Sequence, residues 1–280
     1  MITLLSTRYS TLNYVVAATL LPLVFLIAFF FYPVARLMLL SVGDGTLVQY
    51  ERAFFDGLYL AVLLNTGEIA LWVSLICLVL GYPVAYFLAN TRPFWAAIGF
   101  LVVMLPFWTS LLVRTYAWMV LLGHNGIINR VLQASGFIDE PIALLHNKIG
   151  VIIGMVHALL PYFIFSVYAV MKRIDRELMA AAAGLGAPQW LIFWRIYIPL
   201  TMPGVVAGFM LVFVLSLGFF ITPALLGGGR VVMIATVIER LVRELLDWEF
   251  AAALCVILLA LTLAIYAAVS QVLRGDTKWY

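Results

Sequence analysis

The sequence predicts an all-α polytopic membrane protein with six transmembrane helices. Of its 280 residues, 66% are hydrophobic and only 10% are charged, and the mean hydropathy is +1.13. Soluble domains are about half apolar and about a quarter charged, so this composition requires lipid as the solvent. The net charge of +3 is too small and too dispersed for a nucleic-acid-binding surface, which would show clustered basic residues.

Six charge-free runs are long enough to cross a bilayer. About 20 apolar residues are needed to span about 30 Å of hydrocarbon, and each run meets that length. We therefore expect helices at residues 14–35, 60–89, 95–122, 149–171, 203–226 and 250–272. The first run exceeds the apolar region of a cleaved signal peptide, so we expect it to remain as a helix.

An even number of spans places both termini on the same side of the membrane. The total count of Lys and Arg hardly distinguishes the faces, with eight on the side of the termini and seven on the other. A local cluster is more informative, because Lys172, Arg173 and Arg176 directly follow the fourth span and positive residues favour the cytoplasm. We expect the loop 172–202 and both termini to be cytoplasmic.

The loop 172–202 has the pattern of a helix, a sharp turn and a second helix. Residues 178–185 are rich in alanine and favour a helix. Gly186 suits the left-handed position that ends a helix, and Pro188 suits the first turn of the next one. The second segment, 188–197, is rich in aromatic residues and is expected at the membrane interface.

This loop resembles the loop motif of binding-protein-dependent ABC importer permeases: Glu-Ala-Ala, three residues, Gly, nine residues, Ile, one residue, Leu-Pro. The positions that match the motif are Ala181, Ala182, Gly186, Ile196 and Pro199. Two positions depart from it, because Ala180 stands where the family usually has Glu and Ile198 where it has Leu. Ala180 lacks a carboxylate that would help to anchor the loop or its ATPase, and Glu177, one helical turn earlier, is a candidate substitute.

Further runs resemble the spermidine/putrescine-type branch of these permeases and together cover nearly all of residues 60–273. They are Asn65-Thr66, Leu80-Gly-Tyr-Pro-Val-Ala-Tyr, Leu105-Pro-Phe-Trp-Thr-Ser-Leu-Leu-Val-Arg-Thr-Tyr-Ala-Trp, Leu159-Leu-Pro-Tyr, Thr222-Pro-Ala-Leu-Leu-Gly-Gly and Asp247-Trp-Glu-Phe-Ala-Ala-Ala-Leu. The resemblance implies the type I ABC importer permease fold. It divides the chain into an N-terminal helix and first external loop (1–58), the permease core (59–273) and a cytoplasmic tail (274–280).

The resemblance also implies a set of partners in a bacterial inner membrane. A second permease would complete the solute path, two ABC ATPases would dock on the cytoplasmic loops, and an external solute-binding protein would deliver the solute. The chain contains no G-x-x-x-x-G-K-[ST] phosphate loop, so ATP and Mg are expected on the separate ATPase and no cofactor on this chain. The glycine run 227–229 is interpreted as a helix stop in an external loop.

The solute path is predicted from ionisable and aromatic residues within the spans. Arg114 lies inside the third span, where a central Arg costs about 2.5 to 3.5 kcal/mol, so it either faces the path, forms an ion pair or snorkels to the interface. Glu68 shares a helix face with Asn65 and Trp72, and it either meets a cationic solute or is hydrated or paired with Arg114. The path residues expected here are Glu68, Trp108, Arg114, Tyr162 and Phe219.

The residues do not decide the charge of the solute. Polyamine-type members are expected to line the path with acidic and aromatic groups, yet the fifth span has Phe219-Phe220 where such members often carry an acid. Polyamines, amino-acid-like and phosphonate-like solutes all stay possible. The external loops 36–59, 123–148 and 227–249 are rich in carboxylates, which suits either a receptor surface or ordinary solvation.

An intramembrane enzyme and a channel are the alternative function classes. An enzyme would need a nucleophile with a base or a metal motif, and the three histidines, His124, His146 and His157, have no ligand spacing. We expect His157 to be a packed, hydrogen-bonded residue, and Cys77 and Cys255 to pack as small apolar side chains. Four prolines within the expected spans are potential hinges: Pro83, Pro106, Pro161 and Pro223.

Overall fold

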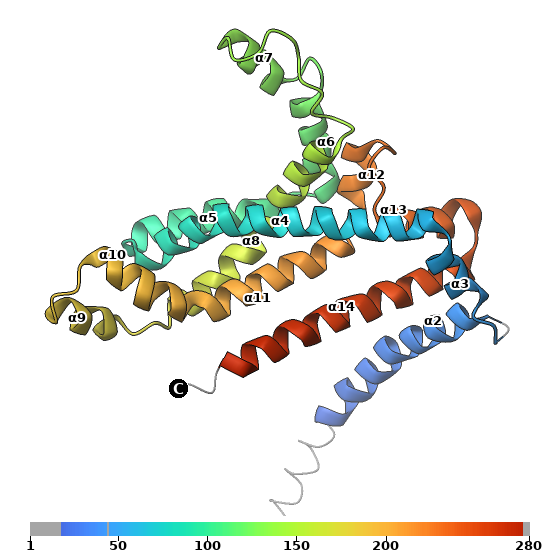
Figure 1. The fold of residues 1–280 in the computed structure, drawn as a ribbon, viewed down its shortest axis with the longest axis horizontal. Coiled ribbons are helices and arrows are strands. Elements are labelled where there is room, and N and C mark those ends of the chain that lie inside the picture. The colour runs from blue at the N-terminus through green and yellow to red at the C-terminus, as the bar shows by residue number, and fades with distance from the viewer. Residues whose placement is uncertain (1–17, 44, 277–280) are drawn as a thin grey trace, which may run out of the picture. The chain divides into compact units, whose positions relative to one another are not determined.

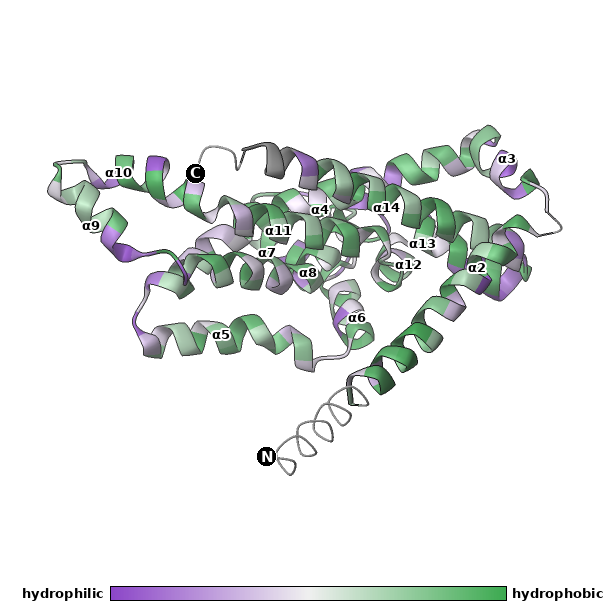
Figure 2. Cartoon of the chain, turned by 90° about the horizontal axis from the view of Figure 1, so that it is seen from below, coloured by the Kyte–Doolittle hydropathy of each residue, from purple (hydrophilic) through white to green (hydrophobic). Residues whose placement is uncertain are grey.

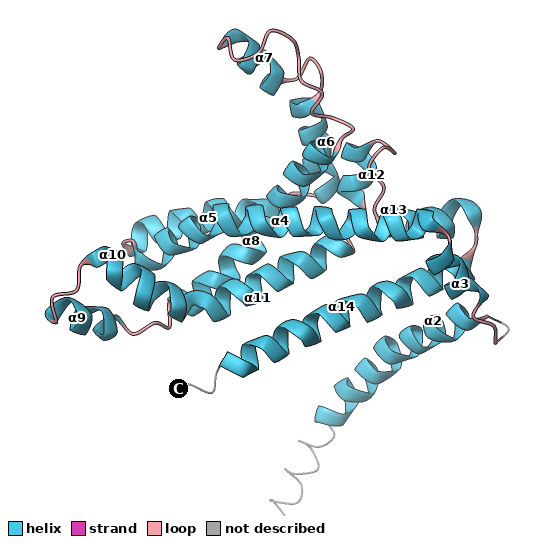
Figure 3. Cartoon of the chain, viewed as in Figure 1, coloured by secondary structure: helices cyan, strands magenta, loops and turns pink. Residues whose placement is uncertain are grey.

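The computed structural model describes residues 18–43 and 45–276, with side chains up to residue 271, and its regular elements within that part are all helices (Figure 3). Five helical stretches are long and apolar enough to cross a membrane, and a sixth span forms if the bent pair α5 (Pro93–Trp108) and α6 (Leu111–Leu122) crosses as one. The five are Ala18–Val42, α4 (Gly57–Asn90), α8 (Lys148–Met171), Gln189–Leu217 and Trp248–Gln271. The expected helical class is confirmed. In Figure 2, hydrophobic colouring dominates the long helices, and hydrophilic residues gather near helix ends and in connections.

The chain forms two compact units, which are described separately. The first contains the chain up to Asp56 together with Leu241–Leu261, and the second contains Gly57–Arg240 together with the chain from Thr262 onward (Figure 1). Helix α14 (Trp248–Asp276) therefore begins in the first unit and ends in the second.

The first unit connects the first span to the beginning of the last one. Its first span contains a π-helical turn, η1 (Ile27–Phe31), and continues through α2 (Tyr32–Val42), seven residues beyond the expected end at 35. Residues 14–17 of the expected helix lie outside the described part. Helix α3 (Val48–Phe55) follows, and the π-helical turn η3 (Leu241–Leu245) leads to α14.

An ion pair and a cation-π contact attach α3 to the start of α14. Arg52 Nη1 lies 3.0 Å from Asp247 Oδ2, and its guanidinium stands 4.1 Å from the centre of the Phe250 ring. Gln49 Nε2 donates to Glu249 Oε2 at 3.3 Å. These contacts hold the first unit's helix ends together although the residues are almost 200 positions apart in sequence.

The second unit is built on α4, α8 and α11 (Ile198–Leu217), which pack against one another (Figure 1). Glycines allow the close approach that helices use in lipid, where the hydrophobic effect does not drive helix association. A Cβ added to Gly81 of α4 would lie 2.5 Å from the ring of Phe163 in α8, and one added to Gly208 of α11 would lie 3.1 Å from the same ring. The Phe163 ring is fully buried where α8 meets α4 and α11.

The expected continuous helix over residues 95–122 is wrong. Helix α5 ends at Trp108, Thr109 is extended and Ser110 is not helical, and the helical stretch that begins with α6 leaves at 98° to α5. Pro106 has no backbone N–H and leaves the Val102 carbonyl without its helical donor near this end of α5. The Thr109 hydroxyl donates to the Pro106 carbonyl at 3.1 Å. Helix α6 then leads to the short helix α7 (Ile127–Ala134).

The expected fifth span, 203–226, is wrong at both ends. The helix begins at Gln189, directly after Pro188, and runs through α10 (Gln189–Ile192), the π-helical turn η2 (Phe193–Tyr197) and α11. It ends at Leu217 before Gly218, and the separate helix α12 (Ile221–Gly227) follows. Pro223 therefore lies in the first turn of a short helix, which tolerates proline, and is not a hinge within a span. Pro83, Pro106 and Pro161 lie inside α4, α5 and α8 as expected.

Candidate functional site: the loop 172–202 and the bend between α5 and α6

The loop 172–202 contains helix α9 (Arg176–Gly184), which ends in the turn expected from its sequence. The Asp175 side chain begins the helix by accepting a hydrogen bond from the Glu177 N–H at 2.9 Å. Gly186 has a φ of +86°, the left-handed conformation. Its N–H donates to the Ala183 carbonyl at 3.0 Å, and the Ala187 N–H donates to the Ala182 carbonyl at 3.1 Å. These two bonds form a Schellman motif, so the predicted conformation of Gly186 is confirmed.

Helix α9 presents an uncovered surface. None of its residues is buried, and the adjacent Leu185 is 90% exposed. Of the motif positions, Glu177, Ala180, Ala181, Gly186 and Pro199 are exposed, and Ala182 and Ile196 are partly buried. Met179 points the other way and packs against the core of the second unit. One face of α9 is therefore attached to the protein while the other is free.

A group of side chains that the sequence did not reveal connects this loop to α4. We call it the Tyr197 cluster: Tyr86 and Asn90 from α4 with Phe193 and Tyr197 from η2. The three rings are in mutual contact, with Tyr86 meeting Phe193 and Tyr197 edge to face. Asn90 Nδ2 donates to the Tyr197 hydroxyl at 3.0 Å. The only local sequence signal was the density of aromatic residues after Pro188.

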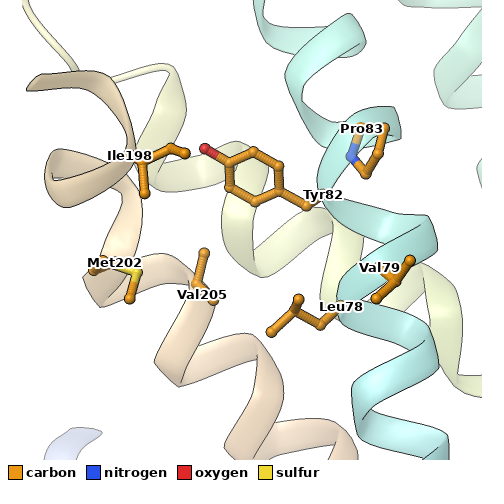
Figure 4. A pocket seen from close by; sticks show the side chains of 7 residues that line it. All are labelled: Leu78, Val79, Tyr82, Pro83, Ile198, Met202 and Val205. Atoms are coloured by element: carbon orange, nitrogen blue, oxygen red, sulfur yellow. The ribbon is translucent and has the colours of Figure 1, made fainter. Parts of the chain in front are cut away.

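An apolar cavity of about 340 Å³ lies beside the Tyr197 cluster, between α4 and α11 (Figure 4). Its lining consists of Leu78, Val79, Tyr82, Pro83, Ile198, Met202 and Val205. The Tyr82 side chain extends from α4 toward Ile198, and its hydroxyl is 3.1 Å from Thr201 Oγ1. The Tyr82 hydroxyl therefore has a hydrogen-bond partner, and the rest of the lining is apolar.

Arg114 lies at the bend between α5 and α6. Its Nη2 donates to the Thr109 carbonyl at 3.1 Å, so the cation stands at the C-terminal end of α5, where the helix dipole favours positive charge. Within the described residues, the Arg114 Nε atom is buried and has no hydrogen-bond partner. A small cavity of about 40 Å³ is lined by Arg114, Tyr162 and Phe107, together with Pro106, Ala158 and Pro161. Arg114 thus faces a polar hollow at the break in the span.

The structure brings together only two of the five expected path residues. Arg114 and Tyr162 line the same cavity, whereas Glu68, Trp108 and Phe219 are not part of its lining. Trp108 is 71% exposed, and Phe219 packs against the core.

Glu68 is neutralised by a lysine. Its Oε2 lies 2.8 Å from Lys148 Nζ, and the two side chains are each about half exposed. The alternative pairing of Glu68 with Arg114 is therefore wrong. Asn65, one turn earlier, donates to the Val232 carbonyl at 2.8 Å, so it fixes α4 to the chain that precedes α13 (Ile234–Arg240).

Two of the three histidines, His157 and His146, have structural roles. Trp118 Nε1 donates to His157 Nδ1 at 3.1 Å, which confirms the expected packed and hydrogen-bonded residue. The His146 N–H donates to the Leu226 carbonyl at 2.8 Å, and its ring fills the space where Gly228 has no Cβ. Gly228 is left-handed and follows the end of α12, so the glycine run is the helix stop that the sequence predicted. Among the described residues, no three His, Cys, Asp or Glu side chains form a metal-binding group.

The fold and the exposed loop define a multi-span helical permease. The chain belongs to the family of binding-protein-dependent transport system inner membrane components, whose profile matches residues 6–275. It is therefore a permease subunit of an ABC importer in the bacterial inner membrane, and ATP hydrolysis takes place on a separate chain. This family excludes the alternatives of an intramembrane enzyme and a channel.

Two relatives and one solved structure illustrate the similarity. The spermidine/putrescine transport system permease protein PotB of Haemophilus influenzae is 34% identical over 264 residues, covering 89% of this chain and 92% of that protein. PotB of Escherichia coli is 38% identical over 236 residues, covering 83% and 86%. A chain of a bacterial alginate ABC transporter, solved with its alginate pentasaccharide-bound periplasmic protein, is 19% identical with a TM-score of 0.72 and coverage of 97% and 98%. That structure supports the type I importer permease fold.

Proposed function

We propose that this chain forms half of the translocation path for a polyamine-type solute. The observation that carries the proposal is the 34 to 39% identity to spermidine/putrescine permeases over more than four fifths of the chain. In the proposed assembly, a second permease supplies the other half of the path and two ABC ATPases bind and hydrolyse ATP with Mg. An external solute-binding protein delivers the solute to the carboxylate-rich loops.

Helix α9 is the proposed docking element for one ATPase. Support comes from its exposed face, from the 90% exposure of Leu185, and from the hydrogen-bonded turn at Gly186. Ala180 and Glu177 lie one turn apart on this helix and are both exposed, so Glu177 is placed to supply the carboxylate that Ala180 lacks. Because α9 would bind a cytoplasmic ATPase, both termini are proposed to be cytoplasmic, in agreement with the cluster Lys172, Arg173 and Arg176.

The proposed path on this subunit uses aromatic faces more than free carboxylates. The side chains assigned to it are Glu68, Trp108, Arg114, Tyr162 and Phe219. Ammonium groups that lose water bind well over aromatic rings, and the exposed Trp108 and the partly exposed Tyr162 offer such rings. Glu68 would contribute only when it leaves Lys148, and an anionic solute would instead favour contact with Arg114.

Two measurements test the proposal. Calorimetry of the cognate solute-binding protein with spermidine, putrescine, amino acids and phosphonates identifies the solute class. Uptake into proteoliposomes is then measured with the complete set of subunits and with this chain alone. We expect polyamine binding, and uptake that requires ATP and every partner. Binding of an anionic solute instead, or ATP-driven uptake by this chain alone, would contradict the proposal.

A further inference from the structure

We propose that the Tyr197 cluster is the contact through which α9 displaces the end of α4 during transport. The inference rests on the proposed docking of the ATPase on α9 and adds the route by which that docking reaches the spans. Tyr86, Asn90, Phe193 and Tyr197 are thereby positioning residues, because they act on the path through α4 and touch neither nucleotide nor solute.

The first step of this route is a direct contact between α9 and η2. Five residues form η2, and its first and last ones, Phe193 and Tyr197, supply two of the three rings of the cluster. A π-helical turn is a local widening of the helix and often occurs at functional positions. Here it ends two residues before Pro199, which has no backbone N–H to donate. The loop therefore enters the span through a segment whose regular hydrogen bonding is already interrupted.

The second step is the interlocking of η2 with α4. The ring centres of Tyr86 and Phe193 are 5.6 Å apart at 87°, and those of Tyr86 and Tyr197 are 5.3 Å apart at 85°. Phe193 and Tyr197 themselves stack at 5.9 Å and 15°. The edge of a ring directed at the face of another is a favoured arrangement, and the Tyr86 ring makes it with two rings that stand side by side. Sliding α4 past η2 would break both contacts together.

The third step is a hydrogen bond at the end of α4. Asn90 is the last residue of that helix, and its Nδ2 atom donates both to the Tyr197 hydroxyl at 3.0 Å and to the Tyr86 carbonyl at 2.9 Å. One amide thus ties η2 to the last turn of α4. Tyr197 is only 4% exposed, so water competes little for its hydroxyl. The last turn of α4 is consequently fixed to η2 by both rings and a directed bond.

The fourth step is a weak point in α4 just before its last part. Pro83 lies seven residues before Asn90 and leaves the Val79 carbonyl without its helical donor, which weakens the helix at that point. The cavity of about 340 Å³ adjoins both Pro83 and Val79 (Figure 4). Two residues before Pro83, Gly81 lies tightly against Phe163 of α8. Residues 84–90 are packed as well, because Ala85 and Leu88 are fully buried in the same core. A displacement of η2 that pulls this part of α4 therefore also moves the side chains packed against it, with Pro83 as the point where α4 can bend.

A double-mutant cycle of transport coupling tests the route. The complete importer is reconstituted with Tyr197→Phe, Asn90→Ala and the double variant, and the ATP hydrolysed per polyamine accumulated is measured. We expect each single variant to raise this ratio about threefold, the size of effect that a lost hydrogen bond gives, and the double variant to add nothing further. Tyr82→Phe is the matched control, because it removes a hydroxyl that joins α4 to Thr201 of α11, the helix that continues η2, outside the cluster, and we expect the wild-type ratio.

Several results of this cycle would overturn the route. An unchanged ratio in both single variants would do so, as would additive effects or an equal effect of Tyr82→Phe. A parallel fall of uptake and ATP hydrolysis at a constant ratio would show a merely structural role. These outcomes differ from failure of the proposed function, in which the wild-type importer itself shows no ATP-driven polyamine uptake.

A distance measurement tests the same route without a transported solute. Spin labels are attached at the exposed positions Trp190, in α10 between α9 and η2, and Arg92, after replacement of Cys77 and Cys255, in the complete importer with and without ATP. In the wild type, we expect the distance between the labels to be the same with and without ATP. In Tyr197→Phe, we expect this distance to differ between the two nucleotide states. A wild-type separation that changes with nucleotide by more than the width of its distribution would refute the attachment of α4 to the loop.

Discussion

The replacement Gly186→Val tests the loop 172–202 most directly, because the structure separates its conformational effect from a steric one. Gly186 has a φ of +86°, and a Cβ added there would meet no atom within 4 Å. Valine would therefore fit the space and would be opposed only by its backbone conformation. An L-residue in the left-handed region costs about 1 to 2 kcal/mol, and a β-branched one lies at the upper end.

The turn has two ways to respond, and valine shifts the balance toward the one that abolishes docking. It can keep its shape and bear that strain, or it can open and lose the two hydrogen bonds to the carbonyls of Ala182 and Ala183, each worth about 0.5 to 1.5 kcal/mol. The two bonds together favour the native turn by about 1 to 3 kcal/mol, and the strain of valine removes about 1.5 kcal/mol of that preference. Since 1.4 kcal/mol is a factor of ten in an equilibrium constant, the docking-competent loop should become about tenfold rarer.

The assay is ATP hydrolysed per solute imported by the reconstituted importer, with co-purification of the ATPase as a second readout. We expect Gly186→Val to raise this ratio and to weaken co-purification at an unchanged amount of membrane protein. Gly184→Val is the matched control, because Gly184 is helical, also has open space, and valine is a better helix former than glycine. Wild-type coupling in Gly186→Val, or equal uncoupling in both variants, would refute the reasoning.

Two further predictions concern the second unit. Glu68→Gln breaks an exposed ion pair with Lys148 and should cost at most about 1 kcal/mol of stability, yet it should reduce polyamine uptake without changing basal ATP hydrolysis; unchanged uptake would remove Glu68 from the path. Gly81→Ala places a methyl group 2.5 Å from the Phe163 ring and should lower the free energy of unfolding by about 1 to 3 kcal/mol, measured as a lower melting temperature in detergent. Gly67→Ala, in the same helix but with open space, should not lower it, and equal melting of the two variants would contradict the packing argument.

Some features of this protein follow from the sequence because they depend on short stretches of chain. The need for about 20 apolar residues per span is a property of the bilayer, so composition and run length identify the membrane helices without knowledge of their neighbours. The turn at Gly186 is equally local: alanines before it favour a helix, and glycine alone tolerates the left-handed conformation well. The motif around it places the chain in its family by the same local pattern.

Only the tertiary structure decided where the spans break and how their polar side chains are satisfied. The non-helical Thr109 and Ser110 interrupt an apolar run, and such a break in lipid depends on neighbours that satisfy the freed backbone groups, as Arg114 does for the Thr109 carbonyl. The partners Lys148 for Glu68 and Tyr197 for Asn90 are 80 and 107 positions away in sequence. A hydropathy pattern contains no information on such pairs, because they form only when α4 packs beside α8 and the start of the fifth span.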